Sequence, residues 1–159
     1  MAPISLAWTL LRRPVALVAM TAILAGCGTI STSAPPATPT DFPGIAGRLN
    51  AAGIKVRDWV SGDPGCQDGD LAKTAIRFEA QGLDQAGPVT LYLYIFRNRD
   101  AFERNRDLVG PCAAAFVTAP DTFEELEQSP YVLVSQGPWA PGFEAALRST
   151  LALAAGTGG

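Results

Sequence analysis

The carboxylates best suited to metal binding lie in one turn-rich loop. The segment DPGCQDGD holds Asp63, Asp68 and Asp70 together with two glycines and a proline. Oxygen ligands on a flexible loop suit calcium. The spacing does not match an EF-hand, which needs carboxylates at alternate positions and a distal Glu. We therefore favour a solvated turn and expect no metal site.

A second acidic cluster consists of Asp121, Glu124, Glu125 and Glu127. Glycoside hydrolysis needs two carboxyl groups roughly 5 to 9 Å apart across a cleft, one of them with a pKa raised by burial. The segment 122–128 is expected to form a short amphipathic helix, opened by Asp121 and Glu124. Successive glutamates on such a helix point in different directions. A solvated acidic face is the favoured interpretation, and an envelope hydrolase that uses acidic residues is the alternative.

Nucleophilic catalysis finds little support in the residue types present. The 159 residues include no His, which removes the commonest general base. The two lysines, Lys55 and Lys73, do not lie in a Ser-x-x-Lys arrangement, and no phosphate-binding glycine loop is visible. The net charge of −3 and a pI near 4.8 argue against nucleic-acid binding, which needs a basic surface. We expect no enzymatic activity, no cofactor and no nucleic-acid partner.

The first 26 residues have the organisation of a cleaved signal peptide. Arg12 and Arg13 are the only charges, and an uncharged apolar stretch fills positions 14–26. A membrane span needs roughly 20 apolar residues, so this stretch is short for one, whereas it suits an export signal. A buried hydrophobic helix is the alternative. The arginine pair also fits a twin-arginine signal loosely, and we favour the general secretory route.

The apolar stretch ends in Leu24-Ala25-Gly26-Cys27. This resembles the lipobox of bacterial lipoproteins, and the resemblance covers residues 1–27 only. It implies cleavage before Cys27, a diacylglyceryl group on the Cys27 thiol, and a stable anchor of two or three acyl chains. The chain would then be lipid-anchored on the extracytoplasmic side of a bacterial cell membrane or outer membrane. Gly28, in place of Asp, resembles outer-membrane sorting.

Residues 27–40 are expected to be the lipidated cysteine followed by a tether. Positions 28–40 contain three prolines, six Ser or Thr residues and no charge, so they cannot form a core. Fully extended, they reach roughly 40 Å. We expect a single domain over 41–159 that stands away from the bilayer.

Two cysteines remain once Cys27 is assigned to the anchor. Cys66 lies in the first long loop and Cys112 follows the middle helix. In an exported chain, two remaining cysteines predict one structural disulfide. A redox pair is the alternative, but it usually shows CxxC spacing, which these residues lack.

An aromatic strand face is the candidate binding surface. In the strand predicted over 89–96, Tyr92, Tyr94 and Phe96 alternate with aliphatic residues, and parity places Trp59 of an earlier strand on the same side. If helices cover only the aliphatic face, these four side chains form an exposed patch suited to a ligand or partner. Alternatively, the last helix or the proline-rich segment 137–141 covers them as ordinary core.

The elements that must position these residues follow from apolar periodicity. Helices are expected at 42–52, 100–109, 122–128 and 142–154, and strands at 54–60, 71–80, 89–96 and 131–135. The order favours an α+β fold: a four-stranded, mostly antiparallel sheet with helices packed on one face.

These features together predict a membrane-anchored extracytoplasmic binding or accessory module. Its partners would be the membrane, through the lipid anchor, and an envelope protein. A structural envelope protein without a ligand is a further alternative beside the hydrolase.

Overall fold

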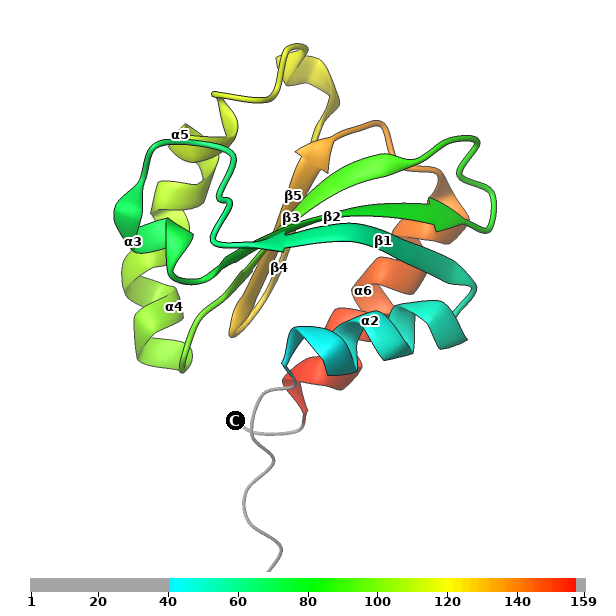
Figure 1. Ribbon diagram of the computed structural model, residues 1–159, viewed down its shortest axis with the longest axis horizontal. Helices are drawn as coiled ribbons and strands as arrows, with labels where there is room; N and C mark the ends of the chain where they lie inside the picture. The colour runs from blue at the N-terminus through cyan, green and yellow to red at the C-terminus, as the bar shows by residue number, and fades with distance from the viewer. Residues whose placement is uncertain (1–40, 157–159) are drawn as a thin grey trace, which may run out of the picture. The chain divides into compact units, whose positions relative to one another are not determined.

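The computed structural model describes residues 41–156, which form an α+β fold built on one antiparallel sheet (Figure 1). The sheet has five strands in the order β1-β2-β3-β5-β4. The strands are β1 (Ile54–Ser61), β2 (Ala75–Gly82), β3 (Val89–Ile95), β4 (Phe123–Gln128) and β5 (Tyr131–Gln136). The α+β class and the antiparallel sheet are confirmed, with five strands where four were expected.

One face of the sheet packs against two helices. They are α2 (Phe42–Ala51) and α6 (Pro141–Ala155), which lie side by side below the sheet in Figure 1. Asp41 caps α2 by accepting a hydrogen bond from the Gly44 amide at 3.0 Å, the usual role of an Asp that directly precedes a helix. The core on this side includes Leu91 and Leu93 of β3, together with Phe143 of α6.

The other face is covered over part of its area by a second layer, which the sequence analysis did not foresee. Its helices are α3 (Gly69–Ala72), α4 (Arg99–Asn105), η1 (Arg106–Leu108) and α5 (Val109–Ala113). They enclose a separate core that includes Tyr94, Phe96, Phe102 and Val134. The expectation of helices on one face is therefore incomplete, because apolar residues on both sides of β3 each have a helical cover.

The segment predicted as a helix at 122–128 is instead a short 3-10 turn, η2 (Pro120–Thr122), followed by strand β4. Strand β4 pairs with β5 along its whole length, from Phe123↔Gln136 to Gln128↔Tyr131. Glutamates favour helices only by tenths of a kcal/mol per residue, and cross-strand pairing outweighs that preference here.

Strand β1 contains an irregularity that changes which side chains share a face. Its register with β2 shifts between Arg57 and Val60, and Asp58 has a positive φ of 50°. The extra residue of such a bulge reverses the alternation beyond it. Trp59 consequently lies beside Phe42 of α2, with ring centroids 5.8 Å apart, on the opposite face from Tyr92. The predicted placement of Trp59 is wrong for this reason.

The predicted signal peptide, Cys27 and the tether lie outside the described residues. Within residues 41–156, no helix has the length and apolar character needed to cross a bilayer.

Candidate ligand-binding groove

The predicted aromatic face is divided between core and surface. Tyr94 is fully buried and Phe96 is 2% exposed, because the second helical layer covers that part of β3. Trp59 is 60% exposed, but on the other face. Only Tyr92 remains half-buried at the boundary of the covered area. The prediction of an open patch of four aromatic residues is therefore wrong. Of the four, only Tyr92 is accessible on this face of β3, and it contacts a second aromatic residue that was not predicted.

That second aromatic residue is Phe116, in the turn after α5. The Tyr92 and Phe116 rings stack with centroids 4.1 Å apart and an interplanar angle of 22°. Gly65 lies against the edges of both rings: a Cβ there would be 2.5 Å from Phe116 and 2.9 Å from Tyr92. Partial burial, and to a smaller degree the charge of Asp63, raise the pKa of the Tyr92 hydroxyl. The hydroxyl therefore stays protonated and can donate as well as accept a hydrogen bond.

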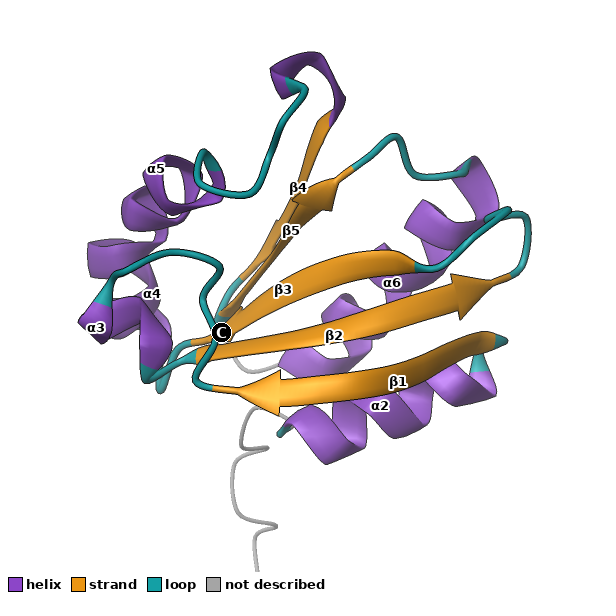
Figure 2. Ribbon diagram, turned by 45° about the horizontal axis from the view of Figure 1, so that its top comes forward, coloured by secondary structure: helices purple, strands orange, loops and turns teal. Residues whose placement is uncertain are grey.

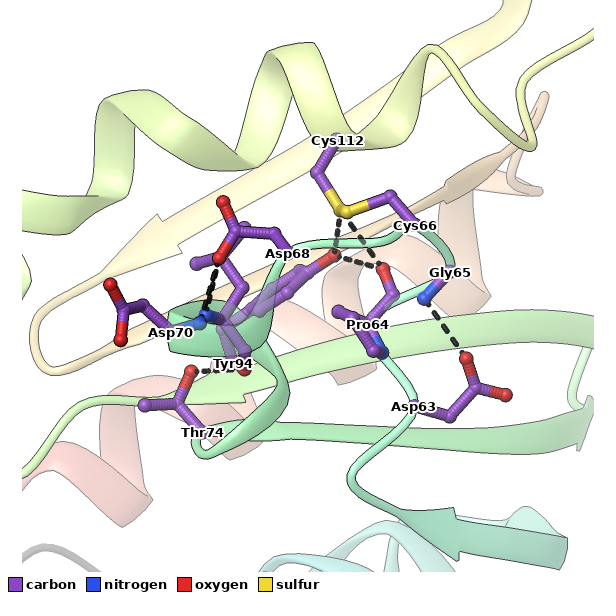
Figure 3. The surroundings of a disulfide bond; sticks show 10 residues. Asp63, Pro64, Gly65, Cys66, Asp68, Asp70, Thr74, Tyr94 and Cys112 are labelled. Carbon is purple, nitrogen blue, oxygen red and sulfur yellow. Dashed lines mark hydrogen bonds between the residues drawn. A yellow bond between two sulfur atoms is a disulfide. The ribbon is translucent and has the colours of Figure 1, made fainter.

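The loop that carries Gly65 is held by covalent and hydrogen-bonded contacts (Figure 3). The disulfide between Cys66 and Cys112 joins it to α5, which confirms the predicted pairing. The buried Tyr94 hydroxyl donates to the Pro64 carbonyl at 2.7 Å. Asp63 accepts hydrogen bonds from the Gly65 amide at 3.0 Å and from Arg77 Nε at 2.8 Å. These contacts hold the loop in place, and the loop in turn holds Gly65 against the rings of the stacked pair.

A groove of about 570 Å³ opens beside the stacked pair. The β3–β5 pairing ends at Leu91↔Ser135, whereas the β2–β3 pairing continues to Val89. Figure 2 shows β3 and β5 separating at this end of the sheet. Residues that line the groove include Gln85, Thr90, Tyr92, Phe116, Gln136 and Pro138. We call this site the Tyr92 groove.

Hydrogen bonds from side chains to the backbone fix the walls of the Tyr92 groove. Gln136 Oε1 accepts from the amides of Thr118 and Ala119, at 2.8 Å and 3.2 Å, and its Nε2 donates to the Thr122 hydroxyl. Gln85, which also lines the groove, accepts at its Oε1 from the Ala140 amide at 2.8 Å. A site whose walls are already ordered loses less conformational entropy when a ligand binds.

Three polar groups in the groove have no hydrogen-bond partner among the described residues. They are the Tyr92 hydroxyl, the Thr90 hydroxyl and the Nε2 of Gln85. None of the described residues that line the groove carries a charge. Within this site, an aromatic surface is therefore combined with neutral donors and acceptors, the usual composition of a small-molecule site.

The acidic loop considered for calcium is occupied by internal contacts. Asp68 Oδ1 caps α3 by accepting from the amides of Asp70 and Leu71, each at 2.9 Å. Asp70 pairs with Lys73 at 2.7 Å, and the hydrogen bond between them lowers the pKa of the Asp70 carboxyl. Among residues 41–156, no group of three or more His, Cys, Asp or Glu side chains is placed to hold a metal ion.

The second acidic cluster lies on an edge strand. Glu125 and Glu127 are two residues apart on β4 and so share a face of the sheet, while Glu124 lies on the other face. Glu127 pairs with Arg106 at 2.7 Å. Partial burial, followed by the charge of Glu127, raises the pKa of Glu125. None of these carboxylates lines the Tyr92 groove.

Sequence reasoning found Tyr92 but missed the rest of the groove. The strict alternation of 89–96 identified the tyrosine, whereas Phe116 and Gln136 reach the site through pairings between distant segments. The cysteine spacing was the one available signal for Phe116, because the disulfide at Cys112 brings that turn to the loop beneath the rings.

No protein-family model, no curated protein and no solved structure matches this chain.

Proposed function

We propose that this protein is a lipid-anchored, extracytoplasmic binding module that uses the Tyr92 groove to contact its ligand. One observation carries the binding role: a groove of about 570 Å³, lined by a stacked aromatic pair and neutral polar groups and free of carboxylates among its described lining residues. The signal-peptide pattern and the lipobox at Cys27 support the anchor and the extracytoplasmic location.

The alternative, an envelope hydrolase, rests on the Glu125–Glu127 pair. The raised pKa of Glu125 is a property expected of a general acid. However, both side chains project from the same strand, and Glu127 is engaged by Arg106. Two carboxyl groups that act on a glycosidic bond must approach it from opposite sides, which this arrangement does not provide. Binding is therefore the better-supported function.

Site-specific photocrosslinking in cells tests the binding role. A photoreactive phenylalanine analogue replaces Thr90 in the groove, and the matched control carries it at Leu153, which is 63% exposed on α6. We expect a defined adduct from position 90 that is absent from position 153. Equal labelling at both positions, or no adduct at position 90 with the full-length protein present, would contradict a ligand-binding groove.

A further inference from the structure

The chemistry of the Tyr92 groove points to one class of ligand, and this inference rests on the proposed binding function. We propose that the groove binds a neutral oligosaccharide, with one pyranose ring packed beside the Tyr92–Phe116 pair. Charged ligands fit poorly, because the described lining residues are uncharged and the charged groups that act on Tyr92, Asp63 and Arg77, already pair with each other at 2.8 Å. This argues against phosphates, nucleotides and free amino acids.

The aromatic pair matches the apolar part of a sugar. A pyranose ring exposes a face of C–H groups whose partial positive charge complements the negative face of an aromatic ring. Gly65 lies against both rings of the Tyr92–Phe116 stack, so the rings are held in place before a ligand binds. A preformed aromatic surface of this kind favours a rigid partner that has an apolar face.

The free polar groups match the hydroxyl groups around the ring. The hydroxyls of Tyr92 and Thr90 can each donate and accept, and Gln85 Nε2 can donate two hydrogen bonds. Sugar hydroxyls likewise donate and accept. The Gln85 side-chain amide is held in place because its Oε1 accepts from the Ala140 amide at 2.8 Å, and its Nε2 keeps both hydrogens available for a ligand.

An extended peptide is the competing occupant, and the sheet gives it less support. Peptides commonly bind by adding a strand to a free sheet edge. Strand β3 is an inner strand, paired with β2 on one side and β5 on the other, so only its end at Val89 and Thr90 lacks a β5 partner. That length is too short for a strand-addition site.

Calorimetric titration of the full-length protein in detergent tests the inference. The probes are chitotetraose, cellotetraose and maltotetraose, with a proline-rich decapeptide as the competing ligand class. We expect at least one tetrasaccharide to bind with a dissociation constant below about 1 mM, and the peptide to bind more weakly.

Substitutions locate the binding. Tyr92→Ala should weaken it by about tenfold or more, and the removal of a single polar group in Thr90→Val or Gln85→Glu by roughly 3- to 10-fold. Gln85→Glu keeps the oxygen that accepts from Ala140, so it changes the donor without removing the wall contact. Trp59→Ala, which removes an exposed aromatic residue on the other face, should leave the affinity unchanged. Thr90→Val keeps the test valid if Tyr92→Ala fails to fold.

The outcomes separate this inference from the proposed function. Binding of the peptide alone, or no tetrasaccharide binding while position 90 still gives a crosslinked adduct in cells, would overturn the saccharide class and leave the binding groove standing. Saccharide binding that is insensitive to Tyr92, Thr90 and Gln85 would place it elsewhere and also overturn the inference. The absence of both the adduct and the titration signal would overturn both proposals.

Discussion

Gly65 is the residue through which the disulfide loop supports the aromatic pair. Its φ of +79° is one that side chains rarely adopt, and a Cβ there would meet both rings. We expect Gly65→Ala to lower the free energy of unfolding by about 1 to 3 kcal/mol and to displace Phe116 from Tyr92. Urea denaturation and near-ultraviolet circular dichroism measure the two effects.

Gly69→Ala is the matched control for this prediction, because a Cβ at Gly69 meets nothing within 4 Å. A Gly65→Ala protein that unfolds like the control, with its aromatic spectrum unchanged, would show that the loop does not constrain the rings.

Tyr92 and Tyr94 project from the same face of β3 and have different roles. Tyr94 is fully buried, and its hydroxyl donates to the Pro64 carbonyl, whereas Tyr92 is half-buried in the groove. Tyr94→Ala should therefore destabilise the fold by about 3 to 5 kcal/mol, as large aromatic truncations in cores do. Tyr92→Ala should cost clearly less. If chemical denaturation shows that both variants lose a similar unfolding free energy, Tyr92 is a core residue and the basis for the groove is removed.

At the scale of elements, the Cys66–Cys112 disulfide joins the loop after β1 to α5 across 46 positions of sequence. Closing a loop of that length stabilises the fold by about 4 kcal/mol in the chain-entropy model. The double substitution Cys66→Ala with Cys112→Ala should lower the unfolding free energy by an amount of that order. Amide exchange should accelerate first in α3, α4 and α5, since that layer contains the bridge. Exchange that accelerates equally in α2 and α6 would contradict a local role.

The β2–β3 hairpin is tied to α6 by Asp84, which accepts hydrogen bonds from the Gly142 and Phe143 amides, each at 2.8 Å. The Gly142 bond is the main cause that lowers the pKa of Asp84 below its ordinary value of 3.8. A carboxyl whose pKa is lower in the folded state stabilises the fold at pH above its unfolded value, and that contribution is lost as the pH falls through the folded value.

Asp84→Asn should therefore destabilise the protein at pH 7, and its difference from the wild type should shrink as the pH falls below about 4. Urea denaturation at pH 7, 4 and 2.5 measures that difference. Asp121→Asn is the control, because Asp121 forms no hydrogen bond or ion pair among the described residues. A difference between the Asp84 variant and wild type that is constant with pH would rule out the carboxylate as the group responsible.

The elements also show how far sequence reasoning reaches. Helix α2 was predicted nearly to its ends, because its cap, its apolar spacing and the following glycine are all local signals. Strand β4 was mistaken for a helix, because its glutamates favour helix locally and only the pairing with β5 makes it a strand. Trp59 was assigned to the wrong face of the sheet, because that assignment assumed regular alternation along an unbroken strand. No residue pattern in the sequence indicated the bulge at Asp58.

On the scale of the whole molecule, the described part of the chain consists of one sheet with two cores of unequal extent. The α2–α6 core spans the sheet, while the disulfide-linked layer covers only part of the other face and leaves the Tyr92 groove open. The groove therefore exists because the second layer is incomplete. It was beyond prediction from sequence, since the extent of that layer depends on where the chain turns after α5.

Anchoring belongs to this same scale, because it would hold the first residue of the domain within about 40 Å of a membrane surface, the reach of the extended tether. Cys27→Ala should leave the protein as an uncut precursor or release it from the membrane fraction, as measured by fractionation and by the mass of the mature chain. The unfolding free energy of the domain should stay unchanged, because Cys27 lies in the predicted anchor segment, outside the part of the chain that contains the two described cores. Cys66→Ala with Cys112→Ala is the control: it removes the disulfide, weakens the fold and should leave the lipid attachment intact. Normal processing and membrane attachment of the Cys27→Ala protein would contradict the lipoprotein interpretation, while the binding groove would remain to be explained by a different means of localisation.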